Sequence, residues 1–137
     1  MVKKIYVDIC GDLFHPGHIN FFKKCLKLYP DAELMVGILS DNQVASYKRV
    51  PMLTTEERKT MIESCKYVNE VFVAPPIPVT EDFINEHKID MVMHANDMSE
   101  KELNYWYADA KKLGKFRVVE YTRGISTTEL IMRIKSR

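Results

Sequence analysis

Hydrophobic residues along the chain follow two alternating patterns. Short, mostly apolar runs predict five strands, at residues 5–9, 33–39, 70–73, 89–94 and 116–121. Between these runs, apolar residues recur every three or four positions, which is typical of helices that bury one face. Such alternation favours a parallel sheet with right-handed crossovers and helices on both faces. We therefore expect one Rossmann-like α/β domain over residues 1–137, with a five-stranded parallel sheet.

Capping signals indicate where several helices begin. Segments 54–57 and 126–129 each have a Thr or Ser three residues before a Glu, the spacing of a capping box. Ser99 is expected to cap a helix that continues to Gly114. The stretch between the second strand and residue 54 is polar, and we expect a mobile loop there that carries Lys48.

Composition limits the classes of partner. The chain of 137 residues is 46% hydrophobic with a net charge of +1, which suffices for a core but gives no electrostatic footprint for nucleic acid. Its three cysteines are widely spaced and odd in number, which favours a reducing compartment over a disulfide framework. No signal-peptide stretch precedes the first strand, and no apolar run could span a bilayer. We expect a cytoplasmic protein that binds neither nucleic acid nor membrane.

The junction between the first strand and the first helix carries two histidines, His15 and His18. Their spacing places both rings on one side of a helix, where Pro16 suits the first turn and Gly17 leaves the backbone open. A helix N-terminus attracts anions, so the pair could hold a polyphosphate. An ordinary exposed pair remains equally open, and a zinc site would need further ligands that the local sequence lacks.

Polar residues also follow other strands, and the carboxyl ends of parallel strands are where such sheets bind ligands. Neither Gly-x-Gly-x-x-Gly nor a Walker A loop is present. The last predicted helix begins with hydroxyl residues after Gly124, which could be a simple N-cap or a second phosphate cradle. The polar residues expected to converge are Asp12 and His15, then His94, Asn96 and Asp97, then Thr122 and Arg123.

Two basic residues allow a structural and a functional interpretation. Lys48 is either an ordinary solvated residue or a clamp on a triphosphate. Arg58 lies in the first turn of a helix, where a cation opposes the helix dipole, so it needs an anionic partner. That partner could be a ligand, or simply Glu56 or Glu57.

Together these motifs resemble the cytidylyltransferase family that makes CDP-alcohols, within the superfamily marked by His-x-Gly-His. The resemblance spans nearly the whole chain. It rests on residues 12–18, Lys48 after Ser40 and Asp41, Glu57 with Arg58, residues 66–71 and residues 121–128. It implies a reaction of CTP, with Mg²⁺, and a small phosphomonoester that yields a CDP-alcohol and pyrophosphate. It also implies a homodimer formed through residues 66–71.

The resemblance also implies roles for individual residues. The catalytic residues would be His15, His18 and Lys48. No protein side chain is expected to bind a metal. The acceptor would contact Asp12, Lys48, Ile77 and Tyr107. The nucleotide would be bound by Cys10, Gly11, Asp12, Gly17, Arg58, His94, Asn96, Asp97, Arg123, Gly124, Ile125, Ser126 and Thr127.

The chain departs from the family pattern at several positions. Tyr121 replaces an arginine, and Arg123, two residues later, could supply the missing charge. Lys66 and Asn69 replace Arg and Asp, and Ile77 stands where choline- and ethanolamine-phosphate enzymes have an aromatic ring. Because aromatic faces attract quaternary ammonium, we expect phosphoethanolamine before phosphocholine or glycerol 3-phosphate. An ATP-dependent adenylyltransferase and a non-catalytic nucleotide-binding domain remain alternatives.

Overall fold

The computed structural model describes residues 1–137 and confirms the predicted fold class. All five strands pair in parallel in one sheet, in the order β3-β2-β1-β4-β5. The strands are β1 (Lys4–Ile9), β2 (Glu33–Ile38), β3 (Glu70–Val73), β4 (Met91–Ala95) and β5 (Phe116–Val119). The helices are α1 (Pro16–Leu28), α2 (Asp41–Ala45), α3 (Thr55–Glu63), α4 (Glu81–Glu86), α5 (Glu100–Trp106), α6 (Ala108–Lys112) and α7 (Thr127–Ser136).

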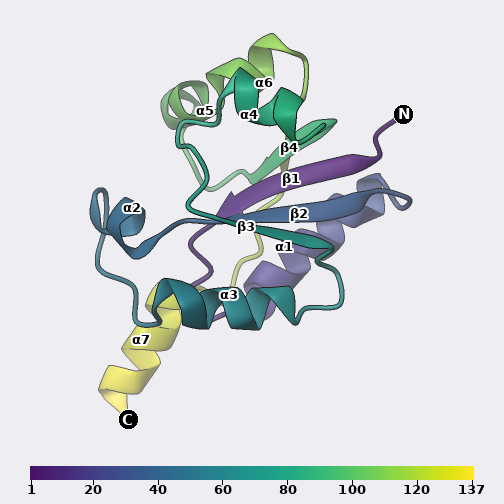
Figure 1. Cartoon of the computed structure of the whole chain (residues 1–137). Helices are drawn as coiled ribbons and strands as arrows, with labels where there is room; N and C mark the ends of the chain where they lie inside the picture. Colours follow the sequence, from purple (N-terminus) through teal and green to yellow (C-terminus); the bar gives the residue numbers. More distant parts are fainter.

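The sheet separates two hydrophobic cores. Helices α1 and α3 cover one face, and α4, α5 and α6 cover the other (Figure 1). Alternate residues of β1 serve the two faces: Ile5 and Val7 pack with Phe22 of α1, whereas Tyr6 packs with Phe83 of α4. Each such buried side chain stabilises the fold by about 1.5–3 kcal/mol. The sheet is therefore fixed from both sides, and its strand ends form a rigid platform.

Two helical segments differ from the sequence prediction. The stretch expected to be an unstructured loop contains the short helix α2, whose cap Ser40 forms a reciprocal capping box with Gln43. The single helix expected from Ser99 to Gly114 is broken between α5 and α6 at Tyr107, whose φ of −126° and ψ of 25° are not helical. Tyr107 is buried, and its hydroxyl reaches across to Asp8 on β1. This long-range hydrogen bond helps to hold the break.

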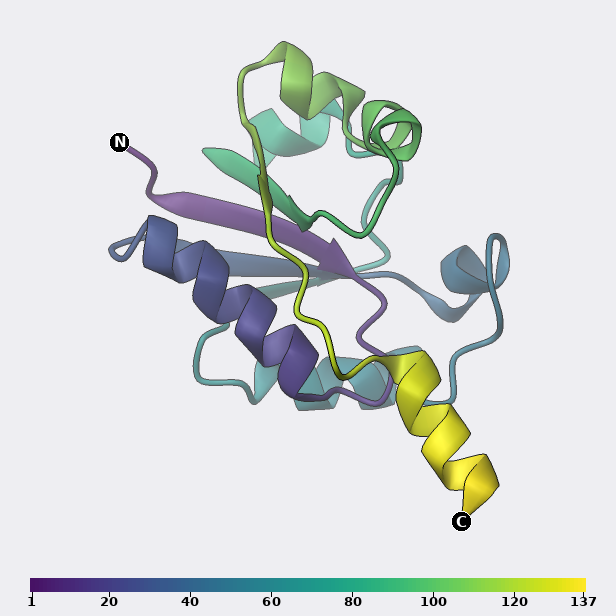
Figure 2. The ribbon, with the colours of Figure 1, turned by 180° about the vertical axis from the view of Figure 1, so that it is seen from behind.

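The last helix, α7, projects from the body of the domain, as Figure 2 shows from behind. None of its residues is buried. Ser126 caps it as predicted by accepting the N–H of Glu129, but the Glu129 carboxylate faces Arg133 at 3.7 Å instead of completing a capping box. The box predicted at Thr54 and Glu57 is complete.

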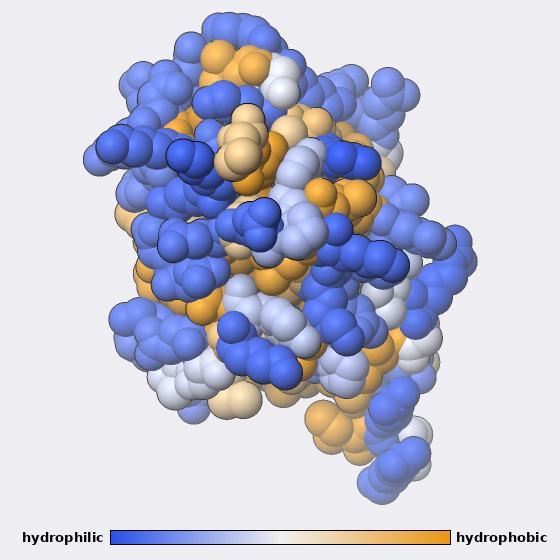
Figure 3. Space-filling model, turned by 90° about the vertical axis from the view of Figure 1, so that its right-hand side faces the viewer, coloured by the Kyte–Doolittle hydropathy of each residue, from blue (hydrophilic) through white to orange (hydrophobic).

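The outer surface is mainly polar. On the face in Figure 3, hydrophilic residues predominate, and apolar residues show between them in separate groups. None of the helices combines the length and the apolar composition that a membrane span requires. The polar exterior agrees with the balance of charges in the sequence.

Candidate active site

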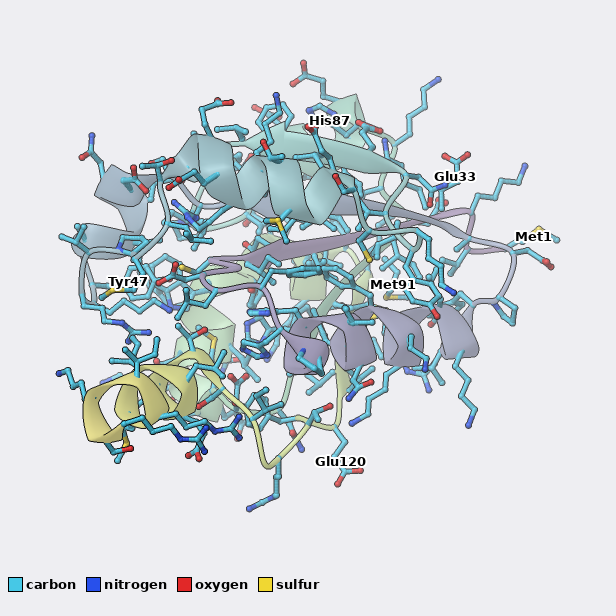
Figure 4. All side chains as sticks on the ribbon, turned by 90° about the horizontal axis from the view of Figure 1, so that it is seen from below. Met1, Glu33, Tyr47, His87, Met91 and Glu120 are labelled. Atoms are coloured by element: carbon cyan, nitrogen blue, oxygen red, sulfur yellow. The ribbon has the colours of Figure 1, made fainter.

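A cleft of about 600 Å³ opens at the carboxyl ends of the strands. Figure 4 labels Tyr47 beside α2 at this end of the molecule, while Met1 and Glu33 lie at the opposite end. The cleft therefore lies at the edge of the sheet where parallel sheets bind ligands. Of the residues expected at the site, the cleft is lined by Cys10, Gly11, Asp12, His15, Gly17, His18, Lys48, Ile77, His94, Asp97, Tyr107, Ile125, Ser126 and Thr127.

His15 and His18 cap the first turn of α1 reciprocally. The Nδ1 atom of His15 accepts the N–H of Gly17 at 3.0 Å, and Nδ1 of His18 accepts the N–H of His15 at 3.1 Å. A ring nitrogen that accepts an N–H bond carries no proton, so each neutral ring carries its proton on Nε2. The two ring centroids are 3.9 Å apart. The cap thus sets both histidines as neutral Nε2–H donors in the cleft.

The electrostatic surroundings keep this pair neutral. The pKa of His18 is lowered to about 3, mainly by burial and then by the nearby His15 and Lys48, against the opposing charge of Asp12. Burial also lowers the pKa of His15. Protonation would place a second positive charge beside Lys48 and break the cap, so the rings act as hydrogen-bond donors without net charge near pH 7.

Two glycines allow the chain to fold this closely around the cleft. A Cβ atom on Gly17 would lie 2.7 Å from Cε1 of His15, so any side chain would displace the ring. Gly11 has a φ of +69°, and its Cβ would lie 2.6 Å from Cδ1 of Ile62. Both positions therefore require glycine, for close approach at Gly17 and for close approach with a left-handed backbone at Gly11.

A second helix N-terminus meets the first. The Thr127 hydroxyl donates to the Asp12 carbonyl at 2.9 Å, which ties the start of α7 to the loop before α1. Ser126 is the N-cap, and Ile125 lines the cleft beside it. The arrangement places the N-termini of α1 and α7 at the same opening, where the helix dipoles favour an anion.

Asp12 has a structural task that the sequence did not predict. It is only 2% exposed, and its carboxylate accepts the N–H groups of Met52 at 2.8 Å and Leu53 at 2.9 Å. These bonds anchor the far end of the loop that carries Lys48. Asp12 lines the cleft, but each of its oxygens already holds this loop.

Arg58 was predicted to bind the nucleotide, and the structure places it behind the cleft wall instead. Its side chain is fully buried and does not line the cleft. Its ionic partner is Asp41 at 2.7 Å, neither a ligand nor Glu56 or Glu57, and this hydrogen bond lowers the pKa of Asp41. The other groups that accept its donors are the carbonyls of Cys10, Leu39 and Leu53 and the hydroxyl of Thr55. Arg58 therefore joins the ends of β1 and β2 to α3.

Three further predicted residues lie outside the cleft lining. The Asn96 side chain accepts the N–H of Tyr121 at 2.7 Å and so links the segments after β4 and β5. Arg123 and Gly124 are exposed residues in the segment before α7. The order of the strands alone does not reveal that these three residues lie outside the cleft lining.

Asp8 is the main site residue that sequence reasoning missed. It lines the cleft, is 8% exposed, and accepts the Tyr107 hydroxyl at 2.6 Å. Burial raises the pKa of Asp8, although the Tyr107 bond and the charge of His94 oppose this effect. The available signal was a charged residue inside an otherwise apolar strand, because such residues are rarely buried without a partner or a function.

The cleft mouth also has aromatic walls. Tyr47 and Trp106 both line the cleft, and their ring centroids are 6.1 Å apart. At the end of β4, Nδ1 of His94 lies 2.7 Å from the Ala95 carbonyl and 3.6 Å from the Asp97 carboxylate. The cleft therefore combines helix N-termini and imidazoles with a buried carboxylate and aromatic rings.

Comparison with known proteins agrees with this arrangement. The chain is 35% identical over 132 residues to a probable choline-phosphate cytidylyltransferase of Schizosaccharomyces pombe, covering 96% of this chain and 36% of that protein. It is 35% identical over 135 residues to an ethanolamine-phosphate cytidylyltransferase of Dictyostelium discoideum, with the same coverage of 96% and 36%. The chain thus spans about a third of the length of these relatives.

A solved structure and a family profile complete the comparison. The crystal structure of the lipopolysaccharide core biosynthesis protein from Thermoplasma volcanium shares the fold, with a TM-score of 0.68 and 22% identity, over 91% of this chain and 100% of that one. The profile of the cytidylyltransferase-like family matches residues 10–133, from the end of β1 to α7. This chain belongs to the cytidylyltransferase-like family.

Proposed function

We propose that the protein transfers a cytidylyl group from CTP to a small phospho-alcohol, releasing pyrophosphate. The observation that carries this proposal is the capped histidine pair, which offers two neutral Nε2–H donors beside two helix N-termini. That combination suits a triphosphate, since it stabilises negative charge with preorganised dipoles. The relatives named as choline- and ethanolamine-phosphate cytidylyltransferases support cytidine as the nucleoside.

In this reaction, a phosphate oxygen of the acceptor attacks the α-phosphorus of CTP. A new P–O bond forms, the bond from the α-phosphorus to the bridging oxygen breaks, and pyrophosphate leaves with the electron pair. Such transfers depend on positioning and charge stabilisation more than on a covalent nucleophile. His15 and His18 would donate to the α- and β-phosphate oxygens, and Lys48 would bridge the triphosphate and the acceptor phosphate. Ser126, Thr127 and the N–H groups of α7 would hold the rest of the triphosphate.

Mg²⁺ would enter with the nucleotide. No group of three His, Cys, Asp or Glu side chains is placed to hold a metal ion, and both oxygens of Asp12 are bonded to the backbone. Mg²⁺ commonly binds through substrate phosphates and water with few protein ligands, and this fits the residues present. When bound, the ion would screen the charge of the triphosphate.

For the acceptor, we favour phosphoethanolamine. Asp8 lies in the cleft beneath Tyr107, which donates to one carboxylate oxygen and leaves acceptor capacity for an ammonium N–H. A trimethylammonium has no N–H to donate, and Ile77 offers it no aromatic face. Phosphocholine therefore ranks second. Glycerol 3-phosphate ranks third, because it brings no cation to balance a charged Asp8.

The test is pyrophosphate release with each of the four nucleoside triphosphates and Mg²⁺. The acceptors are phosphoethanolamine, phosphocholine, glycerol 3-phosphate and a flavin phosphate. We expect turnover with CTP and phosphoethanolamine. Turnover with ATP alone would replace the proposal with an adenylyltransferase. CTP binding without pyrophosphate release from any acceptor would favour a non-catalytic nucleotide-binding domain.

We also infer a homodimer and a cytoplasmic location. The segment from Lys66 to Val71 lies at the edge of the sheet, because β3 is an outer strand. Asn69 accepts the N–H of Leu34 at 2.8 Å, which fixes this edge to the neighbouring strand. Sedimentation of the purified protein tests the dimer, and a monomer at micromolar concentration would rule it out.

A further inference from the structure

The two walls of the cleft mouth come from different halves of the sheet. The segment after β2 carries α2 and Tyr47, and the segment after β4 carries α5 and Trp106. Because β1 lies between β2 and β4, these segments flank the end of β1, where Asp8 is found. Tyr47 and Trp106 meet across this gap, with ring centroids 6.1 Å apart and an interplanar angle of 51°. We call these two residues the aromatic clasp.

The aromatic clasp joins the loop of residues 46–50 to α5 on the opposite wall of the cleft. Residues 46–50 are all exposed, and Tyr47 is itself 46% exposed although it lines the cleft. The loop is fixed at its far end by the bonds from Met52 and Leu53 to Asp12. Between that anchor and α2, the Tyr47 ring is the aromatic side chain that reaches α5.

Lys48 follows Tyr47 directly and depends on its position. The ammonium of Lys48 lies 5.6 Å from the centroid of the Tyr47 ring. Lys48 lines the same cleft as His15 and His18, and its charge helps to lower the pKa of His18. A line of contacts thus runs from Trp106 through Tyr47 to Lys48, in the cleft that also holds the histidine pair.

We propose that the aromatic clasp positions Lys48: docking of Tyr47 on Trp106 closes the loop over the acceptor end of the cleft and places the ammonium between the two substrates. Tyr47 and Trp106 are positioning residues and act through Lys48. The kinetic part of this inference rests on the proposed function. The contact itself can be measured without any turnover.

Trp106 is the single tryptophan of the chain, so its fluorescence reports the clasp directly. We expect Tyr47→Ala to increase quenching of this fluorescence by acrylamide, because one of the two tyrosine rings packed against Trp106 is lost. Tyr47→Phe keeps a ring and should restore the wild-type value. Equal quenching in the wild-type protein and Tyr47→Ala would overturn the clasp.

The kinetic arm uses a double-mutant cycle with Lys48→Ala. Tyr47→Ala should lower kcat/KM for the acceptor by about three- to tenfold, the scale of one aromatic pair, and Tyr47→Phe should recover most of it. In the Lys48→Ala background, Tyr47→Ala should change nothing further. A similar loss in both backgrounds would overturn the positioning role.

The exposed Tyr105 also packs on Trp106, with ring centroids 5.0 Å apart, but it neither lines the cleft nor belongs to the loop of Lys48, so it supplies a matched control for the loss of an aromatic neighbour. Tyr105→Ala should leave kcat/KM within twofold of the wild-type value, roughly the scatter of surface substitutions. A loss as large as that of Tyr47→Ala would overturn the assignment to the clasp. If the wild-type protein releases no pyrophosphate with any substrate, the proposed function fails, and the clasp is then decided by the quenching comparison.

Discussion

The backbone N–H of His15 donates to Nδ1 of His18, and this one hydrogen bond links helix capping to the catalytic role that we propose for His18. It satisfies an N–H group at the start of α1 and fixes the His18 proton on Nε2. His15 is fixed in the same way by the N–H of Gly17. A motif that looks like a phosphate signature therefore has a local structural reason for its spacing. The second histidine must lie three residues after the first to reach its N–H group.

We predict that His18→Ala loses both functions of the ring, whereas His18→Asn loses one. Alanine removes the cap and the Nε2–H donor, so we expect a loss of stability of about 1 kcal/mol and a fall in kcat of about a hundredfold or more. The Oδ1 atom of asparagine can accept the His15 N–H, so this variant should regain stability but not turnover. Urea unfolding and steady-state kinetics on both variants test the separation. Normal turnover in His18→Asn would contradict a role for the Nε2–H group.

The lowered pKa of His18 predicts loss of stability in mild acid. The folded pKa of about 3 lies below the unfolded value of 6.5, so the unfolded chain binds more protons between these two pH values. The stabilisation is complete above pH 6.5 and falls with decreasing pH, by up to about 1.4 kcal/mol per pH unit. Asp8 acts in the opposite direction, because burial raises its pKa.

The measurement is urea unfolding between pH 7.5 and 4.5, with His18→Asn as the comparison. The difference in unfolding free energy between the two proteins isolates the contribution of His18 from those of Asp8 and other titrating groups. We expect the wild-type protein to lose stability more steeply below pH 6.5. Parallel curves would show that His18 titrates normally in the folded protein.

Sequence reasoning found the sheet, the cleft and the histidine pair because each has a local pattern. It failed where long-range contacts decide the outcome. The helix through Tyr107 breaks at the residue that bonds Asp8, 99 positions earlier in the chain. Arg58 was expected at a ligand, but three carbonyls and Asp41 occupy its donors, and no spacing in the sequence shows their convergence.

For two other features that we missed, the sequence did contain a pattern that indicated them. Ser40 and Gln43 have the spacing of a capping box, which is sufficient to indicate α2. Asp8 interrupts an apolar strand, and burial of a carboxylate there required an explanation. For Arg123 the sequence offered no such signal, since its exposure and its place outside the cleft lining follow from the path of the chain before α7.

For Arg58 we predict a structural effect rather than a direct effect on nucleotide binding. Arg58→Lys keeps the charge but cannot serve several carbonyls at once, so we expect a loss of stability of at least about 1–3 kcal/mol, the cost of a buried carbonyl without a donor. Asp41→Asn should cost less than about 1 kcal/mol, because the Asp41 side chain is 43% exposed. Denaturant unfolding measures both changes. A fully stable Arg58→Lys variant that no longer binds CTP would contradict this assignment.

Asp8→Asn separates recognition of the acceptor from recognition of the nucleotide. The substitution keeps the shape and a hydrogen-bonding oxygen for Tyr107, but it removes the negative charge that an ammonium would meet in the cleft. We expect KM for phosphoethanolamine to rise by about ten- to a hundredfold, the range for a hydrogen bond to a charged group, with KM for CTP nearly unchanged. Glycerol 3-phosphate, which has no cation, should gain relative to phosphoethanolamine in the same variant. Equal losses with both acceptors would mean that Asp8 supports the fold of the cleft and does not recognise the head group.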